Sequence, residues 1–402
     1  MKQMPPTTLI NRVLPFDVLC LLGLGLFGWV LPADATPSQK WYERLSLRGY
    51  TQIRYNRLLE TNPLLKCEQC DKSWGENGSF FVRRARLILS GDVHERVFAY
   101  IQPDLASQDA GIAQLRDLYF DLALDSEKEF RIRFGQSKVP YGFENLQSSS
   151  NRLPLDRADS FNSAQPNERD LGVFLYWAPQ EIRQRFRQLI DQGLKGSGDY
   201  GVLGFGFSNG QTPNQMEADD TRMMVARVTY PFQLNSGQFF EASVQGYINS
   251  FEPIKPPKVE LAGESPNRDR RIGASFVWYP QPFGIQAEYN WGDGPAFDSS
   301  TQLIRNQTLQ GGYLQAMLLT QIGEQKFNPF ARYQVYDGGK KQEQDARLHR
   351  VRELDVGIEW LPLPAFELTL DYVVSARTTR DSSAPNNEQS GSLLRVQAQF
   401  NY

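Results

Sequence analysis

The sequence predicts an all-β fold, a transmembrane antiparallel β-barrel of about 16 strands, on three observations. Segments in which apolar and polar residues alternate recur from residue 43 onward, and alternate side chains of a β-strand point to opposite faces. The connections between these segments are alternately short and long, which is typical of periplasmic turns and extracellular loops. The final segment, 393–402, is apolar at every second position and ends on an aromatic residue, as expected of a lipid-facing strand that closes a barrel.

The N-terminal region predicts export. Lys2 and Arg12 precede an apolar run over 18–30, and Ala33-Asp34-Ala35 follows it. This order matches a basic region, a short apolar core and an A-x-A cleavage site. The run is too short to span a bilayer, although a membrane-anchor helix is the alternative. We therefore expect residues 1–35 to be a cleaved signal peptide and residues 36–402 to be the barrel domain.

Two cysteines, Cys67 and Cys70, form a C-x-x-C motif in the first long connection. A metal site usually needs two more ligands, and the only histidines, His94 and His349, are not close in sequence. In an oxidising compartment a disulfide within the loop is favoured over a metal or redox pair. We expect no metal and no cofactor.

The composition agrees with a membrane barrel. No stretch after the N-terminal region is apolar enough for a transmembrane helix, and the mean hydropathy is −0.48. A barrel has such a composition because half of the residues in each strand line water. The formal net charge of −3 gives no indication of a nucleic-acid partner, and we expect none.

Period-two segments bounded by turn residues give the expected strands. In chain order they cover 43–56, 79–91, 93–103, 115–125, 130–137, 168–177, 199–208, 222–230, 239–249, 270–279, 284–292, 309–321, 327–337, 350–361, 366–376 and 393–402. An even number of strands is usual for a bacterial single-chain barrel.

The connections support the same topology. The short ones are 125–129, 280–283, 323–325 and 361–365, and the long polar ones are 57–78, 138–167, 250–269, 293–308, 338–349 and 377–392. One connection, 178–198, is long where a short turn is expected. Its apolar residues have helical spacing and predict a small periplasmic helix: Ile182, Phe186, Leu189 and Ile190.

Closure of the barrel explains how so many strands can lie in lipid, because only a closed barrel pairs every backbone group. Aromatic residues near the expected strand ends fit the two interfacial girdles. They are Tyr55, Trp177, Tyr230, Trp278, Trp291, Trp360, Tyr372 and Tyr402. The alternative is that they belong to the core of a soluble β protein.

The polar face of each strand is expected to line the lumen. Placing the apolar face of each strand outward turns several basic residues inward, and Lys138 lies at the end of the fifth strand. These are candidate anion-binding residues: Arg48, Arg54, Arg84, Arg86, Arg131, Arg133, Lys138, Arg227 and Arg395. Arg44, Arg271 and Arg332 have the same phase. Acidic residues come mostly from other strands: Asp121, Asp125, Glu241, Glu288, Glu353, Asp355, Glu359, Glu367 and Asp371. The first, second and last strands should form a basic stripe, and 350–361 and 366–376 an acidic one.

Two roles are open for these charges. Guanidinium groups stay charged and bind oxyanions in a forked geometry, so rows of arginines favour anions. The alternative is that the charges pair across the lumen and only hold it open. The longest connection, from Lys138 to about Asn167, carries further charges at Arg152, Asp156, Arg157 and Asp159. We expect it to fold inward between the fifth and sixth strands and constrict the bore, with a surface loop as the alternative.

Several motifs resemble one known family, the phosphate-selective porins O and P. They are Leu47-Arg48-Gly49-Tyr50-Thr51-Gln52-Ile53-Arg54, Phe81-Val82-Arg83-Arg84-Ala85-Arg86-Leu87, Gly135-Gln136-Ser137-Lys138-Val139-Pro140-Tyr141-Gly142 with Glu144, and Arg169-Asp170-Leu171-Gly172-Val173. The resemblance is clearest over residues 45–177. It implies a homotrimeric, 16-stranded channel in the bacterial outer membrane, surrounded by lipid and lipopolysaccharide, in which arginines and lysines bind phosphate.

The leading functional hypothesis is a passive porin for small anions, with phosphate or polyphosphate preferred. A weakly selective general porin is the alternative, and a plugged structural barrel is a third. An enzyme barrel would need a nucleophile with a histidine base and an orienting acid. We expect no enzyme, because His94 falls at a periplasmic turn and His349 at a loop end.

Overall fold

The computed structural model describes residues 40–59, 78–106, 113–216, 222–250, 257–263 and 268–402. The expected signal peptide 1–35, with Cys20, and the cysteine pair Cys67 and Cys70 lie outside the described residues. Residues Trp41–Tyr402 form one compact unit.

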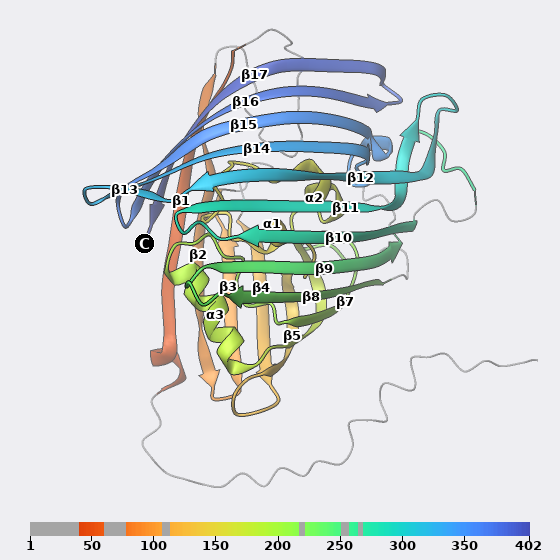
Figure 1. Ribbon diagram of the computed structural model, residues 1–402. Coiled ribbons are helices and arrows are strands. Elements are labelled where there is room, and N and C mark those ends of the chain that lie inside the picture. Colours follow the sequence, from red (N-terminus) through yellow and green to blue (C-terminus); the bar gives the residue numbers. More distant parts are fainter. Residues whose placement is uncertain (1–39, 60–77, 107–112, 217–221, 251–256, 264–267) are drawn as a thin grey trace, which may run out of the picture. The chain divides into compact units, whose positions relative to one another are not determined.

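This unit is a closed antiparallel β-barrel (Figure 1). Each strand pairs with the next along the chain, and the last strand pairs with the first, so that Tyr50 lies opposite Asn401. The strands are β1 (Leu45–Leu58), β2 (Ser79–His94), β3 (Val97–Asp104), β4 (Gln114–Ala123), β5 (Phe130–Lys138), β6 (Arg169–Trp177), β7 (Leu203–Ser208), β8 (Met223–Gln233), β9 (Phe239–Ser250), β10 (Arg268–Trp278), β11 (Phe283–Asp298), β12 (Leu303–Leu318), β13 (Thr320–Ile322), β14 (Gln325–Gly339), β15 (Leu348–Leu363), β16 (Phe366–Asp381) and β17 (Ala384–Asn401). Strand β13 continues β12 after Leu319 and pairs with the same neighbour, β14, so the barrel wall consists of 16 strands. The predicted antiparallel barrel of about 16 strands is confirmed.

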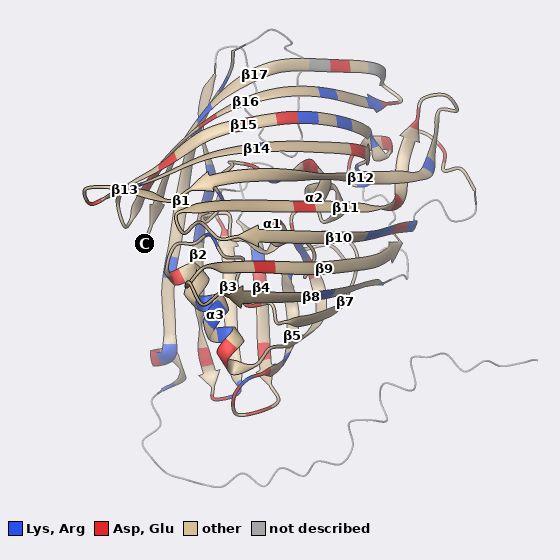
Figure 2. Cartoon of the chain, viewed as in Figure 1, with Lys and Arg blue, Asp and Glu red and all other residues tan. Residues whose placement is uncertain are grey.

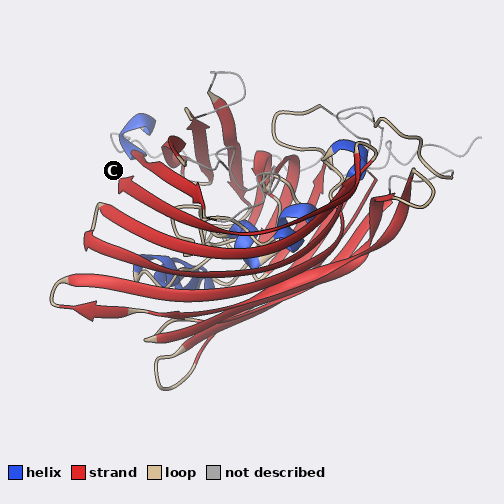
Figure 3. Cartoon of the chain, turned by 90° about the horizontal axis from the view of Figure 1, so that it is seen from above, coloured by secondary structure: helices blue, strands red, loops and turns tan. Residues whose placement is uncertain are grey.

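The helical elements are short. They are η2 (Trp41–Arg44), α1 (Phe143–Leu146), α2 (Asp159–Ala164), α3 (Gln180–Asp191) and η3 (Gln344–Ala346). Figure 3 shows the strands curving around helical segments. None of the helices in the described ranges is long and apolar enough to cross a bilayer.

Burial alternates along the strands in the opposite sense to a soluble protein. In β8 the side chains of Arg227 and Thr229 are buried, whereas Val228 is 55% exposed. The largest fully buried side chains include three arginines, Arg54, Arg227 and Arg332. Polar side chains therefore occupy the face enclosed by the ring, and apolar ones occupy the outer face, as a lipid-facing barrel requires.

The prediction of a long loop is wrong for two connections, and a third loop is shorter than predicted. Residues 293–308 continue β11 and β12 as a paired hairpin, and residues 377–392 continue β16 and β17 as far as the pair Asp381 and Ala384. In 338–349 only Lys340–Arg347 leave the strands. Beyond the lipid both faces of a strand can meet water, so the apolar alternation is lost while the backbone pairing continues.

The expected periplasmic helix is α3. Ile182 and Phe186 pack on Ala178 and Val202, and Leu189 is also buried. Ile190 is 43% exposed, which corrects its expected place on the packed face, because it follows Leu189 by one residue and points about 100° away from it.

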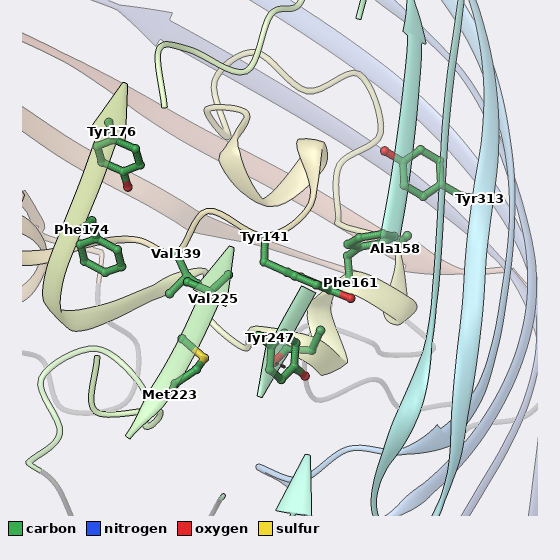
Figure 4. Packing of buried hydrophobic residues seen from close by; sticks show 11 residues of the cluster. Val139, Tyr141, Ala158, Phe161, Phe174, Tyr176, Met223, Val225, Tyr247 and Tyr313 are labelled. Carbon is green, nitrogen blue, oxygen red and sulfur yellow. Dashed lines mark hydrogen bonds between the residues drawn. The ribbon is translucent and has the colours of Figure 1, made fainter. Parts of the chain in front are cut away.

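The segment between β5 and β6 is tied to distant strands. Helix α2 lies against β11, β12 and β14. An apolar cluster joins the segment to β6, β8, β9 and β12, as Figure 4 shows; its members are Val139, Tyr141, Ala158, Phe161, Ala164, Phe174, Tyr176, Met223, Val225, Tyr247 and Tyr313. The segment is thus held by apolar packing as well as by the polar contacts described below.

Candidate functional site

All but one of the nine candidate basic residues lie on the enclosed face. Two other residues predicted to face inward fall outside the strands, Arg44 in η2 and Asp125 in the turn after β4. Eight of the nine candidate basic residues are buried, at between 1% and 8% exposure: Arg54, Arg84, Arg86, Arg131, Arg133, Lys138, Arg227 and Arg395. The ninth, Arg48, is exposed. The candidate residues are spread over β1, β2, β5, β8 and β17, so they do not form a single site.

Six of the nine are neutralised by a carboxylate. Arg54 and Arg395 both contact Asp156, Arg86 Nε lies 2.7 Å from Asp104 Oδ2, Arg131 Nη2 lies 2.7 Å from Asp199 Oδ1, Arg133 Nε lies 2.6 Å from Asp121 Oδ1, and Arg227 Nη2 lies 3.0 Å from Glu241 Oε1. Carboxylates of β3, β4, β9 and two connections therefore lie beside these six arginines. Figure 2 shows the two signs of charge side by side on β15 and on α3. Three of the pairs join adjacent strands: Arg86 with Asp104, Arg133 with Asp121 and Arg227 with Glu241.

Arg84 and Lys138 have different partners. Arg84 Nη1 donates to Gln52 Oε1 at 2.7 Å, and Lys138 Nζ donates to the carbonyl oxygens of Leu146 and Gln147 at 3.0 and 2.7 Å. Neither contacts a carboxylate among the described residues. Both side chains are buried, at 8% and 6% exposure.

Two further arginines lie where a β-bulge shifts the register, and one of them, Arg116, joins Arg84 and Lys138. Arg116 lies at the shift between β3 and β4, and Arg83 at the shift between β1 and β2. Arg116 is 8% exposed; its Nη1 donates to Gln114 Oε1 at 3.0 Å and its Nη2 to the carbonyl of Asn167 at 3.1 Å. A bulge turns two adjacent residues toward one face, so a strict period of two missed both arginines.

Arg84, Lys138 and Arg116 belong to a basic cluster between β2, β4, β5 and the segment before β6. It has seven cationic side chains, Arg84, Arg86, Arg116, Lys138, Arg152, Arg157 and Arg169, against three carboxylates, Asp104, Asp117 and Glu168. Arg169 was not predicted as a site residue; its Nη2 lies 3.0 Å from Asp117 Oδ2. The excess of positive charge makes this cluster the strongest candidate for binding an anion.

Glu168 organises the loop side of the cluster. Its Oε1 lies 3.2 Å from Arg152 Nη2 and 3.0 Å from Arg157 Nε, and its other oxygen contacts Arg169. Burial raises the pKa of this carboxyl, but the surrounding cations outweigh burial and hold the pKa well below its usual range. Burial lowers the pKa of Arg157 to about 10. Glu168 therefore remains ionised and pairs with several cations at once.

The acidic residues of this segment contact basic side chains far away in the sequence. Asp156 Oδ1 lies 3.5 Å from Arg54 Nη1, and Asp159 Oδ2 lies 3.0 Å from Arg377 Nη2. Asp159 also accepts from Lys340. Burial opposes ionisation of Asp159, yet Arg377 and Lys340 hold its pKa far below its usual range. Arg377 and Lys340 were not predicted, because both fall in segments expected to be loops.

The start of the segment is fixed by strand carboxylates. The backbone N–H groups of Phe143 and Glu144 donate to Glu288 Oε2 and Oε1 at 2.6 and 2.8 Å. Arg332 Nη1 donates to Glu144 Oε1 at 2.9 Å, and Arg332 Nη2 lies 2.6 Å from Asp355 Oδ2. The segment thus contacts β11 and β14 through buried charged side chains, and Arg332 links it to Asp355 of β15.

Comparison with known proteins also indicates a porin. A family model described as phosphate-selective porin O and P matches residues 67–254 and 259–402. A search of curated proteins finds no match.

Solved structures share the fold. Salmonella typhi OmpF in complex with daunomycin superposes with a TM-score of 0.54 at 11% identity, covering 91% of this chain and 99% of that one. An anion-selective porin from Comamonas acidovorans gives 0.53 at 12% identity, with 89% and 99% covered. The outer membrane channel DcaP of Acinetobacter baumannii gives 0.51 at 12% identity, with 89% and 97% covered.

At these identities the structural likeness supports the fold alone, whereas the family model extends over most of the sequence. The chain therefore belongs to the phosphate-selective porin O and P family and is a porin of the bacterial outer membrane.

Proposed function

We propose that the protein forms a water-filled channel for passive diffusion of small anions, with phosphate or polyphosphate preferred. The observation that carries the proposal is the basic cluster, in which seven cations face three carboxylates. Buried guanidinium groups stay charged and bind oxyanions through two parallel N–H donors. An anion with several oxygen acceptors, such as phosphate, can form more hydrogen bonds with these donors than chloride can, so it should bind more tightly.

We also propose that residues 138–167 form the constriction of this channel. The support is their contact with buried side chains of several walls: Asp156 with Arg54 of β1, Glu144 with Arg332 of β14, and Phe143 with Glu288 of β11. A segment in contact with opposite walls narrows the space between them. Its basic residues, Arg152 and Arg157, would then lie beside Arg84 and Lys138 where the path is narrowest.

A weakly selective general porin is the alternative, and the neutralised pairs favour it. Arg54, Arg131, Arg133, Arg227 and Arg395 all contact carboxylates. A bore with balanced charge sorts ions weakly by sign. The two proposals differ in whether the cluster on β2, β4 and β5 controls permeation.

The family points to a homotrimer embedded in outer-membrane lipid and lipopolysaccharide, and we propose that assembly for this chain. Its outer face supplies the apolar band that such an environment requires.

The test is ion selectivity in planar bilayers. Reversal potential across a potassium chloride gradient gives the anion-to-cation permeability ratio, and added phosphate measures block of chloride current. In R84A/K138A we expect the permeability ratio and the phosphate affinity each to fall at least threefold. Removing these cations leaves no buried carboxylate without its partner, so the barrel should still fold.

The matched control is R350A/R352A, which removes two charges from outward-facing side chains that are 62% and 44% exposed. This variant should keep the native selectivity. Cation preference of the native channel would contradict the anion proposal. Anion preference without phosphate block, unchanged in R84A/K138A, would support the general porin instead.

A further inference from the structure

The outer wall of the barrel carries an apolar groove. It lies over β7 to β11, has a volume of about 780 Å³, and is lined mainly by outward-facing side chains. This volume is within the range of ligand-binding pockets, about 300–1,000 Å³.

The groove follows from the register of four strand pairs. Phe205, Ala226, Gly246, Ile272 and Trp291 lie opposite one another in a single row across β7, β8, β9, β10 and β11. Ala226 and Gly246 are small and form the floor, while Phe205 on one side and Ile272 with Trp291 on the other form raised edges. A Cβ at Gly246 would lie 3.3 Å from the carbonyl oxygen of Arg271, a close contact, and within 4 Å of no other atom, so the glycine leaves space on the outer side.

One end of the groove is charged. In the neighbouring row, Ile248 lies opposite Arg270, and Arg270 lies opposite Asp293. Arg270 Nη2 is 3.1 Å from Asp293 Oδ1, and the two side chains are 48% and 39% exposed. Arg268, two residues before Arg270, is exposed on the same outward face. Arginines at the end of an apolar groove suit a ligand with a long hydrocarbon chain and a phosphate.

The charged end belongs to the outer leaflet. Strands β9 and β10 are joined at this end by the long connection 251–267, whereas their other ends lead into the short turns 234–238 and 279–282. In outer-membrane barrels the long connections are extracellular. Trp278 and Phe240, stacked 6.1 Å apart, mark the opposite end of the apolar band. The eight steps from Arg270 to Trp278 span about 26 Å along the strand, or about 20 Å along the membrane normal at a tilt of about 40°, so both residues lie close to the edges of an apolar band about 25 Å tall.

We propose that this groove binds the phosphorylated, multiply acylated glycolipid of the outer leaflet, the lipid A part of lipopolysaccharide. One acyl chain lies on Ala226 and Gly246 between Phe205 and Ile272, and a sugar phosphate accepts hydrogen bonds from Arg270 and Arg268. Asp293 competes with the phosphate for Arg270. The proposal rests on the outer-membrane location and not on anion conduction. Lipid A binding and ion selectivity are measured separately, so failure of one proposal can be distinguished from failure of the other.

The test uses the purified, folded full-length protein in detergent, with lipid A added as the probe. Binding is measured by native mass spectrometry and by the shift of the thermal midpoint. We expect G246L, which fills the groove, and R268A/R270A, which removes the phosphate donors, each to weaken lipid A binding at least fivefold. D293N should strengthen binding at least twofold, because it frees Arg270 and removes a repelling charge. The control is A331L, since Ala331 is an exposed alanine of β14 that does not line the groove.

All four variants should retain native conductance and selectivity. Equal lipid A binding by the native protein, G246L and R268A/R270A would overturn the proposal. So would equally tight binding of phosphatidylglycerol, which would make the groove a general lipid surface. Loss of oligomer in G246L with unchanged lipid A binding would show that a second copy of the chain occupies the groove.

Discussion

At the scale of single residues, the interior of this barrel is held by buried ion pairs. Arg332 is the clearest case, because one guanidinium contacts Asp355 of the neighbouring strand and Glu144 of the segment between β5 and β6. All three side chains are at most 2% exposed. Removing one member of such a group leaves uncompensated buried charge.

Arg332→Ala should therefore destabilise the barrel strongly, by about 3–5 kcal/mol. The measurement is thermal unfolding in detergent, with Arg350→Ala as the control, since Arg350 pairs with Asp337 at the exposed surface. Exposed pairs contribute about 0–1 kcal/mol. Equal midpoints for the two variants would contradict this account of Arg332.

Glu168 leads to a prediction about pH. Its folded pKa lies below the usual value, so the carboxylate contributes stability above its unfolded pKa of about 4.3, and that contribution is lost as the pH falls toward the folded pKa. Glu168→Gln should thus unfold at a lower temperature than the native protein at pH 7. The gap between the two midpoints should narrow below about pH 4; a gap that stays constant between pH 7 and pH 3 would exclude this role.

Much of the residue-scale arrangement could be predicted from the sequence. Alternation correctly placed Arg54, Arg84 and Arg227 on the enclosed face. It missed Arg83 and Arg116, because each lies at a bulge where the period of two breaks. It also could not predict pairing: the partners Arg54 and Asp156 are 102 residues apart and meet only when the barrel closes.

At the scale of elements, strand positions were predicted well and loop structure was not. The polar stretches 293–308 and 377–392 resemble loops in composition but form paired hairpins. Residues 139–168 are held by contacts with strands far along the chain. Their own sequence therefore could not predict their conformation. Helix α1, for example, begins where two N–H groups meet Glu288 of β11.

Glu288→Ala should loosen that segment. Four donors then lose their acceptor: the N–H groups of Phe143 and Glu144 and the hydroxyls of Ser275 and Tyr313. Each unsatisfied buried group costs about 1–3 kcal/mol, so the detached state should gain at least roughly fivefold in population. Single-channel recordings should show increased open-channel current noise. Glu324→Ala, at an exposed turn, is the control, and equal noise in both variants would contradict an anchoring role for Glu288.

At the scale of the whole molecule, closure between β1 and β17 decides whether a barrel exists. Beyond the ladder itself, Gly49 N–H donates to the carbonyl of Tyr402 at 2.6 Å, and Tyr402 N–H donates to the carbonyl of Gly49 at 3.0 Å. The Tyr402 ring covers Gly49, so that a Cβ there would lie 2.6 Å from ring atom Cε2 and 2.4 Å from the carbonyl oxygen of Arg86. The glycine allows the last strand to approach the first two.

Gly49→Leu should consequently impair closure, whereas Gly246→Leu, on the open outer face, should not. At Gly49 the added side chain meets a backbone oxygen of the β1–β2 ladder, which cannot move without loss of pairing, and overpacking of this kind costs about 1–3 kcal/mol or more. The measurement is the fraction of refolded protein that migrates as a folded, heat-modifiable band on a gel. A lower folded fraction for Gly49→Leu than for Gly246→Leu is expected. If both glycine variants refold as completely as the native chain, the contact between Gly49 and Tyr402 does not limit closure of the barrel.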